Sequence, residues 1–330
     1  MTKPHNIKRG VSLYSFQEEY FLRKMTLKDI IAACAKMGVY GIETIAEQMM
    51  PGFPNLSDDF YAQWHDWMQQ YGTIPTCHDM FLDTKMRKDR LMTDEEMLNS
   101  VIRDLKHANK LGCTVMRVIV RTPPHIMEMA APYAEKYNVR MGIEIHAPFT
   151  FYSDWIQKHY EVMEKVNSPY LGFVPDMGTF EKRFPRVRSE RYIRRGAKPE
   201  IVEFLNKAYE SGEDVEALRD DVTKMGGGDL ELAMLNDLTR IVYHDPKTLL
   251  EFMPRIFHIH AKFYEMLDDY TEYSIPYEDV VPVLIEGGYN GYLSSEYEGN
   301  RHIQDAFEVN SYEQVRRQQE MFKRLLGETE

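Results

Sequence analysis

A regular alternation of short apolar segments and amphipathic segments runs through almost the whole chain and limits its possible folds. Eight segments have the β-branched and aromatic content of strands and are bounded by turn residues. They are residues 11–14, 41–45, 73–80, 114–120, 140–146, 170–176, 254–264 and 291–297. Eight segments with helical spacing alternate with them, at residues 26–37, 57–72, 94–111, 123–137, 154–166, 246–252, 276–286 and 312–325. Because parallel strands need helical crossovers, this alternation predicts a parallel sheet.

Eight strand–helix units are the number that closes a (β/α)8 barrel, or TIM barrel, and 330 residues suit that fold. We therefore expect one α/β domain over residues 1–330. Residues 180–243 interrupt the alternation, and they are far longer than the usual two to six residues of a βα connection. Since this insertion follows the sixth strand, we expect it at the barrel end where active sites form, as a lid, a subunit-docking segment or a solvated helical insertion.

Composition excludes several classes of protein. The net charge of −12 argues against a nucleic-acid partner, because such proteins usually present a basic face. The three cysteines have neither zinc-site spacing nor the density of a secreted disulfide scaffold. No apolar run approaches the roughly 20 residues needed to span a bilayer, and no apolar signal segment opens the chain. We therefore expect a soluble, cytoplasmic protein with no membrane partner.

Chemically active side chains lie at the ends of the last four predicted strands. Glu144, Asp176, His260 and Glu296 occupy these ends, and in a barrel the ends of neighbouring strands converge above the core. Three carboxylates so close together repel one another unless a cation is present. The set predicts an oxygen-preferring divalent ion such as Mn²⁺ or Mg²⁺. Taken singly, each carboxylate could instead pair with Lys or Arg at the rim.

The seventh strand carries two histidines on one face, because its side chains alternate with period two. His260 lies nearer the carboxyl end and is assigned to the metal. His258 is expected one layer deeper, as a core histidine hydrogen-bonded to a neighbour. Glu43 and Arg117 are expected to be partners in the barrel interior.

His146 shares the inward face of Glu144 and lies one step higher along the strand. A neutral imidazole there could remove a proton from the carbon beside a metal-polarised carbonyl, and the metal would stabilise the enolate. Lys262 is a candidate for neutralising the substrate or enolate oxygen. His78, Glu298 and Arg301 are candidates for binding the substrate at the rim.

The motifs GIEIH, PDMG, HIHAK and SSEYEGN resemble those of the sugar phosphate isomerase/epimerase group of xylose isomerase-like TIM barrels, over nearly the whole chain. The resemblance implies that Glu144, Asp176, His260 and Glu296 hold a metal ion, most often Mn²⁺ in this family, with Mg²⁺ or Co²⁺ possible. The superfamily contains epimerases, isomerases, dehydratases and a DNA-repair nuclease.

A narrower resemblance extends into the insertion. The segments FLDTKM, FPRVRSER, MPRIFHIHAKFYEM, YSIPYE and SSEYEGNRHIQDAFEV resemble the large (alpha) subunit of bacterial C-glycoside deglycosidases. This resemblance implies a lyase that cleaves a 3-oxo-glucosyl C-glycoside and works with a small beta subunit in a hetero-oligomer. His146 matches the base that removes the C2 proton, after which the enolate expels the aglycone, for example a flavonoid.

Three other functions are compatible with the same fold. A ketose 3-epimerase or isomerase would use the same enolate and act alone. An abasic-site nuclease would need more histidines and a basic track for DNA. A non-catalytic binding subunit would keep the barrel without using a metal. The residues inside the barrel do not separate the lyase from the epimerase, since both remove the same kind of proton.

Overall fold

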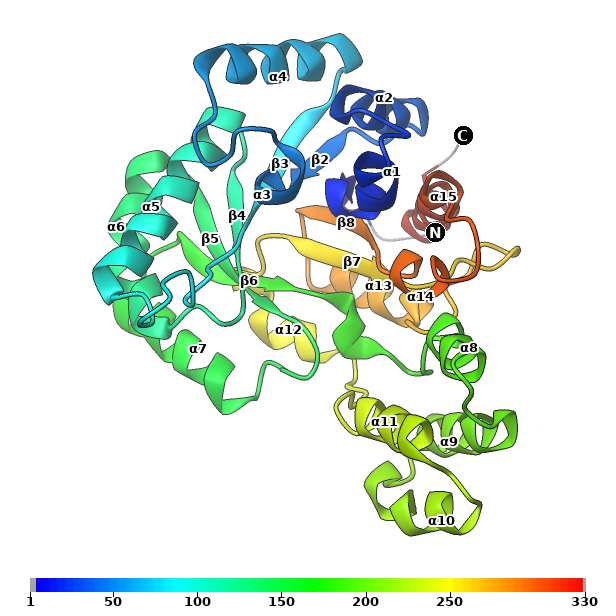
Figure 1. Ribbon diagram of the computed structural model, residues 1–330. Coiled ribbons are helices and arrows are strands. Elements are labelled where there is room, and N and C mark those ends of the chain that lie inside the picture. The colour runs from blue at the N-terminus through cyan, green and yellow to red at the C-terminus, as the bar shows by residue number, and fades with distance from the viewer. Residues whose placement is uncertain (1–3, 329–330) are drawn as a thin grey trace.

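The computed structural model describes residues 4–328, and it confirms the (β/α)8 barrel (Figure 1). Its eight strands are β1 (Lys8–Ser12), β2 (Gly41–Thr44), β3 (Ile74–Met80), β4 (Val115–Val118), β5 (Arg140–Ile145), β6 (Leu171–Pro175), β7 (Ile259–Phe263) and β8 (Tyr292–Tyr297). All neighbouring strands are parallel, in the order β6-β5-β4-β3-β2-β1-β8-β7. Parallel bridges from Phe173 to Ile256 and from Asp176 to His260 join β6 to the β7 segment and close the barrel.

Helices surround the barrel, and their ends carry the capping residues that the sequence predicts. The helices between and after the strands are α2 (Leu27–Lys36), α4 (Asp58–Tyr71), α5 (Asp94–Leu111), α6 (Pro124–Tyr137), α7 (Asp154–Val166), α12 (Thr248–Phe252), α13 (Tyr277–Glu286) and α15 (Ser311–Leu326). Thr26 caps α2 and Thr93 caps α5, each in a reciprocal capping box with the acidic residue three positions on. Gly112, at a φ of 87°, ends α5 in the left-handed conformation that glycine adopts at little cost.

Short helices that the periodicity does not predict extend several loops. They are α1 (Gln17–Phe21), α3 (Ala46–Met49) and α14 (Asn300–Ile303). Each is no longer than five residues, so none shows a hydrophobic repeat in the sequence. No helix within residues 4–328 is long and apolar enough to cross a membrane. The three cysteines are buried, and none of them forms a disulfide.

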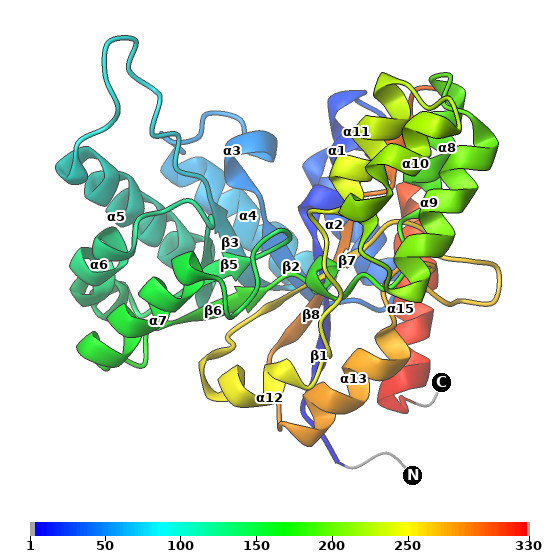
Figure 2. The ribbon, with the colours of Figure 1, turned by 90° about the horizontal axis from the view of Figure 1, so that it is seen from below.

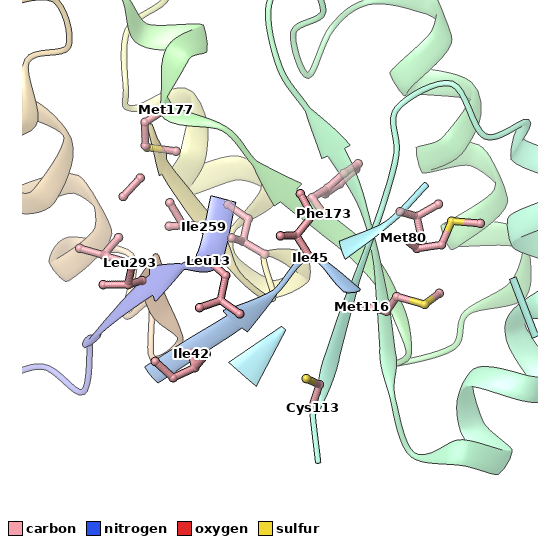
Figure 3. Close-up of a cluster of buried hydrophobic side chains, with 14 of the residues drawn as sticks. Leu13, Ile42, Ile45, Met80, Cys113, Met116, Phe173, Met177, Ile259 and Leu293 are labelled. Atoms are coloured by element: carbon pink, nitrogen blue, oxygen red, sulfur yellow. The ribbon is translucent and has the colours of Figure 1, made fainter. Parts of the chain in front are cut away.

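The two faces of the strands have different chemistry. Ile42, Met116, Ile259 and Leu293 alternate with the inward-pointing residues and belong to the large buried hydrophobic cluster, part of which Figure 3 shows. The residues that alternate with them point into the barrel. A small apolar cluster of Cys77, Val115, Val174 and Phe257 fills the lower part of the interior. Above it the interior is charged, and this charged layer leads to the mouth of the barrel.

The insertion forms a helical layer with its own core. After η2 (Met177–Phe180), it contains α8 (Arg186–Arg194), α9 (Pro199–Ser211), α10 (Arg219–Lys224) and α11 (Asp229–Leu238). Figure 2 shows these helices stacked beside one another at one side of the barrel. Ile201, Leu205, Met234 and Leu235 are fully buried in a separate hydrophobic cluster. The insertion is therefore a packed unit with a core of its own.

Candidate active site

His260 lies at the centre of the charged cluster, and no part of it is exposed. Its Nδ1 is 3.1 Å from Glu144 Oε1 and 3.6 Å from Glu296 Oε1. Glu144, His260 and Glu296 each offer a ligand atom within 4.8 Å of the others, and all three are buried. The structure thus brings together three of the four residues that the sequence assigns to a metal, from β5, β7 and β8.

Glu43 on β2 contacts His260 of β7 and His258, which directly precedes this strand. Its Oε2 is 2.5 Å from His258 Nε2, and its Oε1 is 3.2 Å from His260 Nε2. The expectation that His258 is a hydrogen-bonded core residue agrees with this contact. With Nε2 of His260 facing Glu43, Nδ1 is the nitrogen that faces Glu144 and Glu296. A carboxylate behind a metal-binding histidine commonly fixes the orientation of its ring in this way.

Arg117, which forms an ion pair with Asp79, also lies close to Glu144. The Arg117 side chain donates from Nε to Asp79 Oδ1 at 3.0 Å, and its Nη1 lies 3.9 Å from Glu144 Oε2. Arg117 is therefore an interior partner, as expected from its place in the fourth strand. Burial raises the pKa of the Glu144 carboxyl, but attraction to Arg117 and His260 outweighs it and keeps the pKa well below its ordinary value.

The fourth predicted ligand, Asp176, makes a different contact. Its Oδ2 lies 2.5 Å from Lys262 Nζ, and its Oδ1 accepts a hydrogen bond from the backbone N–H of Gly178. Asp176 is at the end of β6, bridged through the backbone to His260, so it borders the cluster. Burial lowers the pKa of the Lys262 ammonium, but attraction to Asp176, Glu296 and Glu298 raises it well above its ordinary value.

The residues of the cluster fit a divalent cation. Burial raises the pKa of the Glu296 carboxyl to about 8, and repulsion from Asp176 and Glu144 adds to this although His260 and Lys262 oppose it. Glu296 Oε2 is buried without a hydrogen-bond partner among the described residues. Buried carboxylate oxygens normally have partners, and a cation would supply one. Oxygen ligands with one imidazole match the preference of Mn²⁺ or Mg²⁺.

His146 lies directly beyond β5 and is half-buried above the cluster. Its Nδ1 is 2.7 Å from the carbonyl oxygen of Ala147. Because a carbonyl can only accept, Nδ1 carries the hydrogen, and in the neutral ring Nε2 is the nitrogen that can take up a proton. The ring also meets the edge of Phe149.

The three residues predicted to bind substrate lie in different places. Glu298 accepts a hydrogen bond from the Tyr14 hydroxyl at 2.8 Å, and Arg301 lies over the Tyr14 ring at 4.8 Å, so both are at the mouth. His78 is fully buried between Thr44 and Asp104 of α5. Asp79, its neighbour on β3, points into the barrel, so period two turns His78 outward, away from the cluster.

The insertion contributes residues that the sequence does not single out. Arg186 pairs with Glu265, and Arg194 donates to the carbonyl of His302, which ties the insertion to the barrel. Arg188 forms an ion pair with Asp237 at 2.8 Å. Glu181 follows η2 and is buried. Nothing in their local pattern reveals these positions, because the contacts join segments far apart in sequence.

Comparison with known proteins agrees with the fold and with both resemblances. The model of the xylose isomerase-like TIM barrel family matches residues 31–325. A C-glycoside deglycosidase alpha subunit of Arthrobacter globiformis is 33% identical over 93% of this chain and 89% of its own length. The 3'-dehydrocarminate deglycosidase alpha subunit of a Microbacterium species is 29% identical over 97% of this chain and 96% of its own length.

Solved structures show the same architecture. A D-psicose 3-epimerase determined in the presence of D-fructose has a TM-score of 0.58 at 11% identity, over 97% of this chain and 99% of its own. At that identity the likeness concerns the fold alone. The family match and the deglycosidase relatives both extend over most of the chain. The chain therefore belongs to the xylose isomerase-like TIM barrel family and, within it, to the group of C-glycoside deglycosidase alpha subunits.

Proposed function

We propose that this chain is the catalytic alpha subunit of a metal-dependent C-glycoside deglycosidase, a carbon–carbon lyase. Its substrates would be 3-oxo-glucosyl C-glycosides with flavonoid-type aglycones, and its partner a small beta subunit. The observation that carries the proposal is the convergence of Glu144, His260 and Glu296, with Asp176 beside them, in a chain whose deglycosidase relatives match it over most of its length.

Glu144, Asp176, His260 and Glu296 would hold the ion, with Mn²⁺ the first choice and Mg²⁺ or Co²⁺ as alternatives. When bound, such an ion supplies positive charge close to the 3-oxo group of the sugar and makes the neighbouring C2–H more acidic. Glu43 keeps the His260 ring oriented for this role through its contact at Nε2.

His146 would take the C2 proton on Nε2, since its Nδ1–H is held by the Ala147 carbonyl. The electrons of the C2–H bond then form the C1=C2 double bond, and the bond from C1 to the aglycone carbon breaks. Lys262, held beside Asp176, would bring an ammonium close to oxygens that gain negative charge. Glu298 and Arg301 at the mouth would bind the sugar hydroxyls.

The test is incubation of the purified chain with a 3-oxo C-glucoside, with and without a candidate small subunit, and analysis of the products. Release of the aglycone together with an unsaturated 3-oxo sugar supports the proposal. No aglycone in either case would refute it. Conversion of a free ketose to its C3 epimer, with solvent deuterium incorporated, would favour the epimerase reaction that uses the same first step.

A further inference from the structure

A polar cavity of about 190 Å³ lies where the insertion meets the mouth of the barrel. From the barrel side it is lined by Ala147, Pro148, Gly178, Lys262 and Tyr264. From the insertion it is lined by Glu181, Arg188, Asp237, Arg240 and Ile241. Ala147 follows the proposed base His146, and Lys262 pairs with Asp176 at the edge of the metal cluster. The cavity therefore adjoins the place where the reacting carbons would lie.

Glu181 is the buried acid in this wall that has no assigned role. Its exposed fraction is 1%, and its Oε2 has no hydrogen-bond partner within the described residues. Two hydrogen bonds hold the Glu181 backbone: its N–H donates to the Gly178 carbonyl at 3.4 Å, and its carbonyl accepts from the Tyr209 hydroxyl at 3.0 Å. A buried carboxylate oxygen without a partner is costly, and a group bound in the cavity could supply the partner that Glu181 Oε2 lacks.

The neighbours of Glu181 are charged. Arg188 from α8 and Lys262 from β7 attract its carboxylate form, and Asp176 from the end of β6 repels it. Burial is the largest influence and raises the pKa of Glu181 to about 7, with Arg188, Tyr264 and Lys262 opposing it. A carboxyl with such a pKa carries its proton on an appreciable fraction of molecules near neutral pH and can act as a general acid.

We propose that Glu181 is a further catalytic residue, which donates the proton to the aglycone carbon as that carbon leaves C1. This inference rests on the proposed lyase function, because the elimination needs such a donor. The proton from C2 goes to His146, and the C1=C2 bond forms. The electron pair of the broken C1–carbon bond takes up the Glu181 proton. Glu181 then regains a proton from solvent and His146 releases one, so the step balances without an oxidant or a reductant.

The experiment uses Glu181→Gln, an amide of the same shape that has no acidic proton to give. Two rates are measured on a 3-oxo C-glucoside in deuterated water: exchange at C2 and release of the aglycone. We expect C2 exchange to persist, since His146 and the metal site are intact, while release falls by about 10²–10⁴-fold, the usual contribution of a general acid. Release that stays close to the wild-type rate, or exchange and release that fall in parallel, would overturn the proposal.

A second substrate shows whether the variant keeps a working site. The 3-oxo form of 4-nitrophenyl β-glucoside loses a stable phenolate, which leaves without a proton. Glu181→Gln should release 4-nitrophenolate at close to the wild-type rate, and an equal loss on both substrates would contradict a role as proton donor. Glu231→Gln is a matched control, because Glu231 is buried in the insertion and accepts from the backbone N–H of Lys198 and Gly228. It should leave the ratio of the two rates unchanged.

Measurements on the wild-type protein distinguish a failure of the lyase function from a failure of the role of Glu181 alone. If it neither exchanges C2 hydrogen nor releases aglycone, with or without the small subunit, the lyase function fails and the role of Glu181 fails with it. If the wild type does both and Glu181→Gln also does both at the same rates, the lyase function stands and only the proposal for Glu181 is refuted.

Discussion

Replacing Glu43 by glutamine tests whether the carboxylate beneath the two histidines holds the His260 ring in the orientation that metal binding needs. Glu43 is fully buried, with one oxygen 2.5 Å from His258 Nε2 and the other 3.2 Å from His260 Nε2. Burial raises the pKa of this carboxyl, but attraction to His260 and His258 holds the pKa well below its ordinary value. The acid is therefore ionised; one oxygen accepts a hydrogen bond from His258, and the other lies close to His260 Nε2. A glutamine of the same shape has only one accepting oxygen, so one ring loses the carboxylate oxygen that it faces.

The loss of one buried acceptor should lower the free energy of unfolding by about 1–3 kcal/mol. Removal of a carboxylate behind a metal-binding histidine commonly reduces metal affinity about 10–100-fold, which is about 1.4–2.8 kcal/mol. We therefore expect Glu43→Gln to bind Mn²⁺ about 10–100 times more weakly than the wild type. Isothermal titration of the chelator-treated protein with MnCl₂ measures the affinity, and urea denaturation measures the stability.

Asp104→Asn is the matched control. Asp104 is as buried as Glu43 and accepts from His78 Nε2 at 3.1 Å, but it lies on the helix side of the barrel wall. Its variant should lose stability and bind Mn²⁺ as the wild type does. If Glu43→Gln also binds Mn²⁺ as tightly as the wild type, then Glu43 does not contribute to metal affinity by orienting the His260 ring.

Three further predictions concern single residues. His146→Ala should keep its bound metal and lose aglycone release, since His146 lies beside the cluster; loss of the metal itself would make His146 a ligand. Burial and the charges of Arg188, Arg191 and Arg301 lower the pKa of His302 to about 3, so below its ordinary pKa of about 6.5 the unfolded chain takes up a proton that the folded chain does not. The free energy of unfolding therefore carries no penalty from His302 above that pH, and it falls by at most about 1.4 kcal/mol per pH unit as the pH drops below it. Urea denaturation of the chelator-treated protein at pH 7 and pH 5 should show a smaller loss of stability in His302→Gln than in the wild type. An equal loss in both would contradict the assignment. Gly172→Ala should destabilise by about 1–3 kcal/mol or more, because its Cβ would lie 2.2 Å from the Arg255 carbonyl and 2.6 Å from the Phe257 ring, whereas Gly228→Ala has room; equal melting temperatures would contradict this packing.

The sequence predicts the barrel because its signals are local. Period-two alternation and capping residues locate the main helices and seven of the strands to within three residues, whereas the seventh strand begins at Ile259, five residues later than predicted. The same alternation places Glu144, His260 and Glu296 on inward faces, which is why their convergence follows from the order of residues along the strands. It also explains why His78 lies outside the charged cluster, since the inward direction of Asp79 implies that His78 faces the helices.

Other features depend on contacts between distant segments. The pairing of Asp176 with Lys262 joins β6 to β7, and either side chain could have had another partner. The burial of Glu181 depends on α8 and α9, which belong to an insertion with its own core. No periodicity in the sequence encodes how that insertion packs on the barrel mouth, so the cavity between them could not be predicted.

The central claim is that four strand ends hold a catalytic divalent ion, and metal analysis tests it most directly. The wild type, Glu144→Gln and Glu296→Gln would be purified without chelator and measured by inductively coupled plasma mass spectrometry, alongside aglycone release. The account predicts a bound divalent ion, Mn²⁺ foremost, in the wild type and a loss of both ion and activity in the two variants. A wild-type protein without any divalent ion, whose activity is unchanged in the variants, would contradict it.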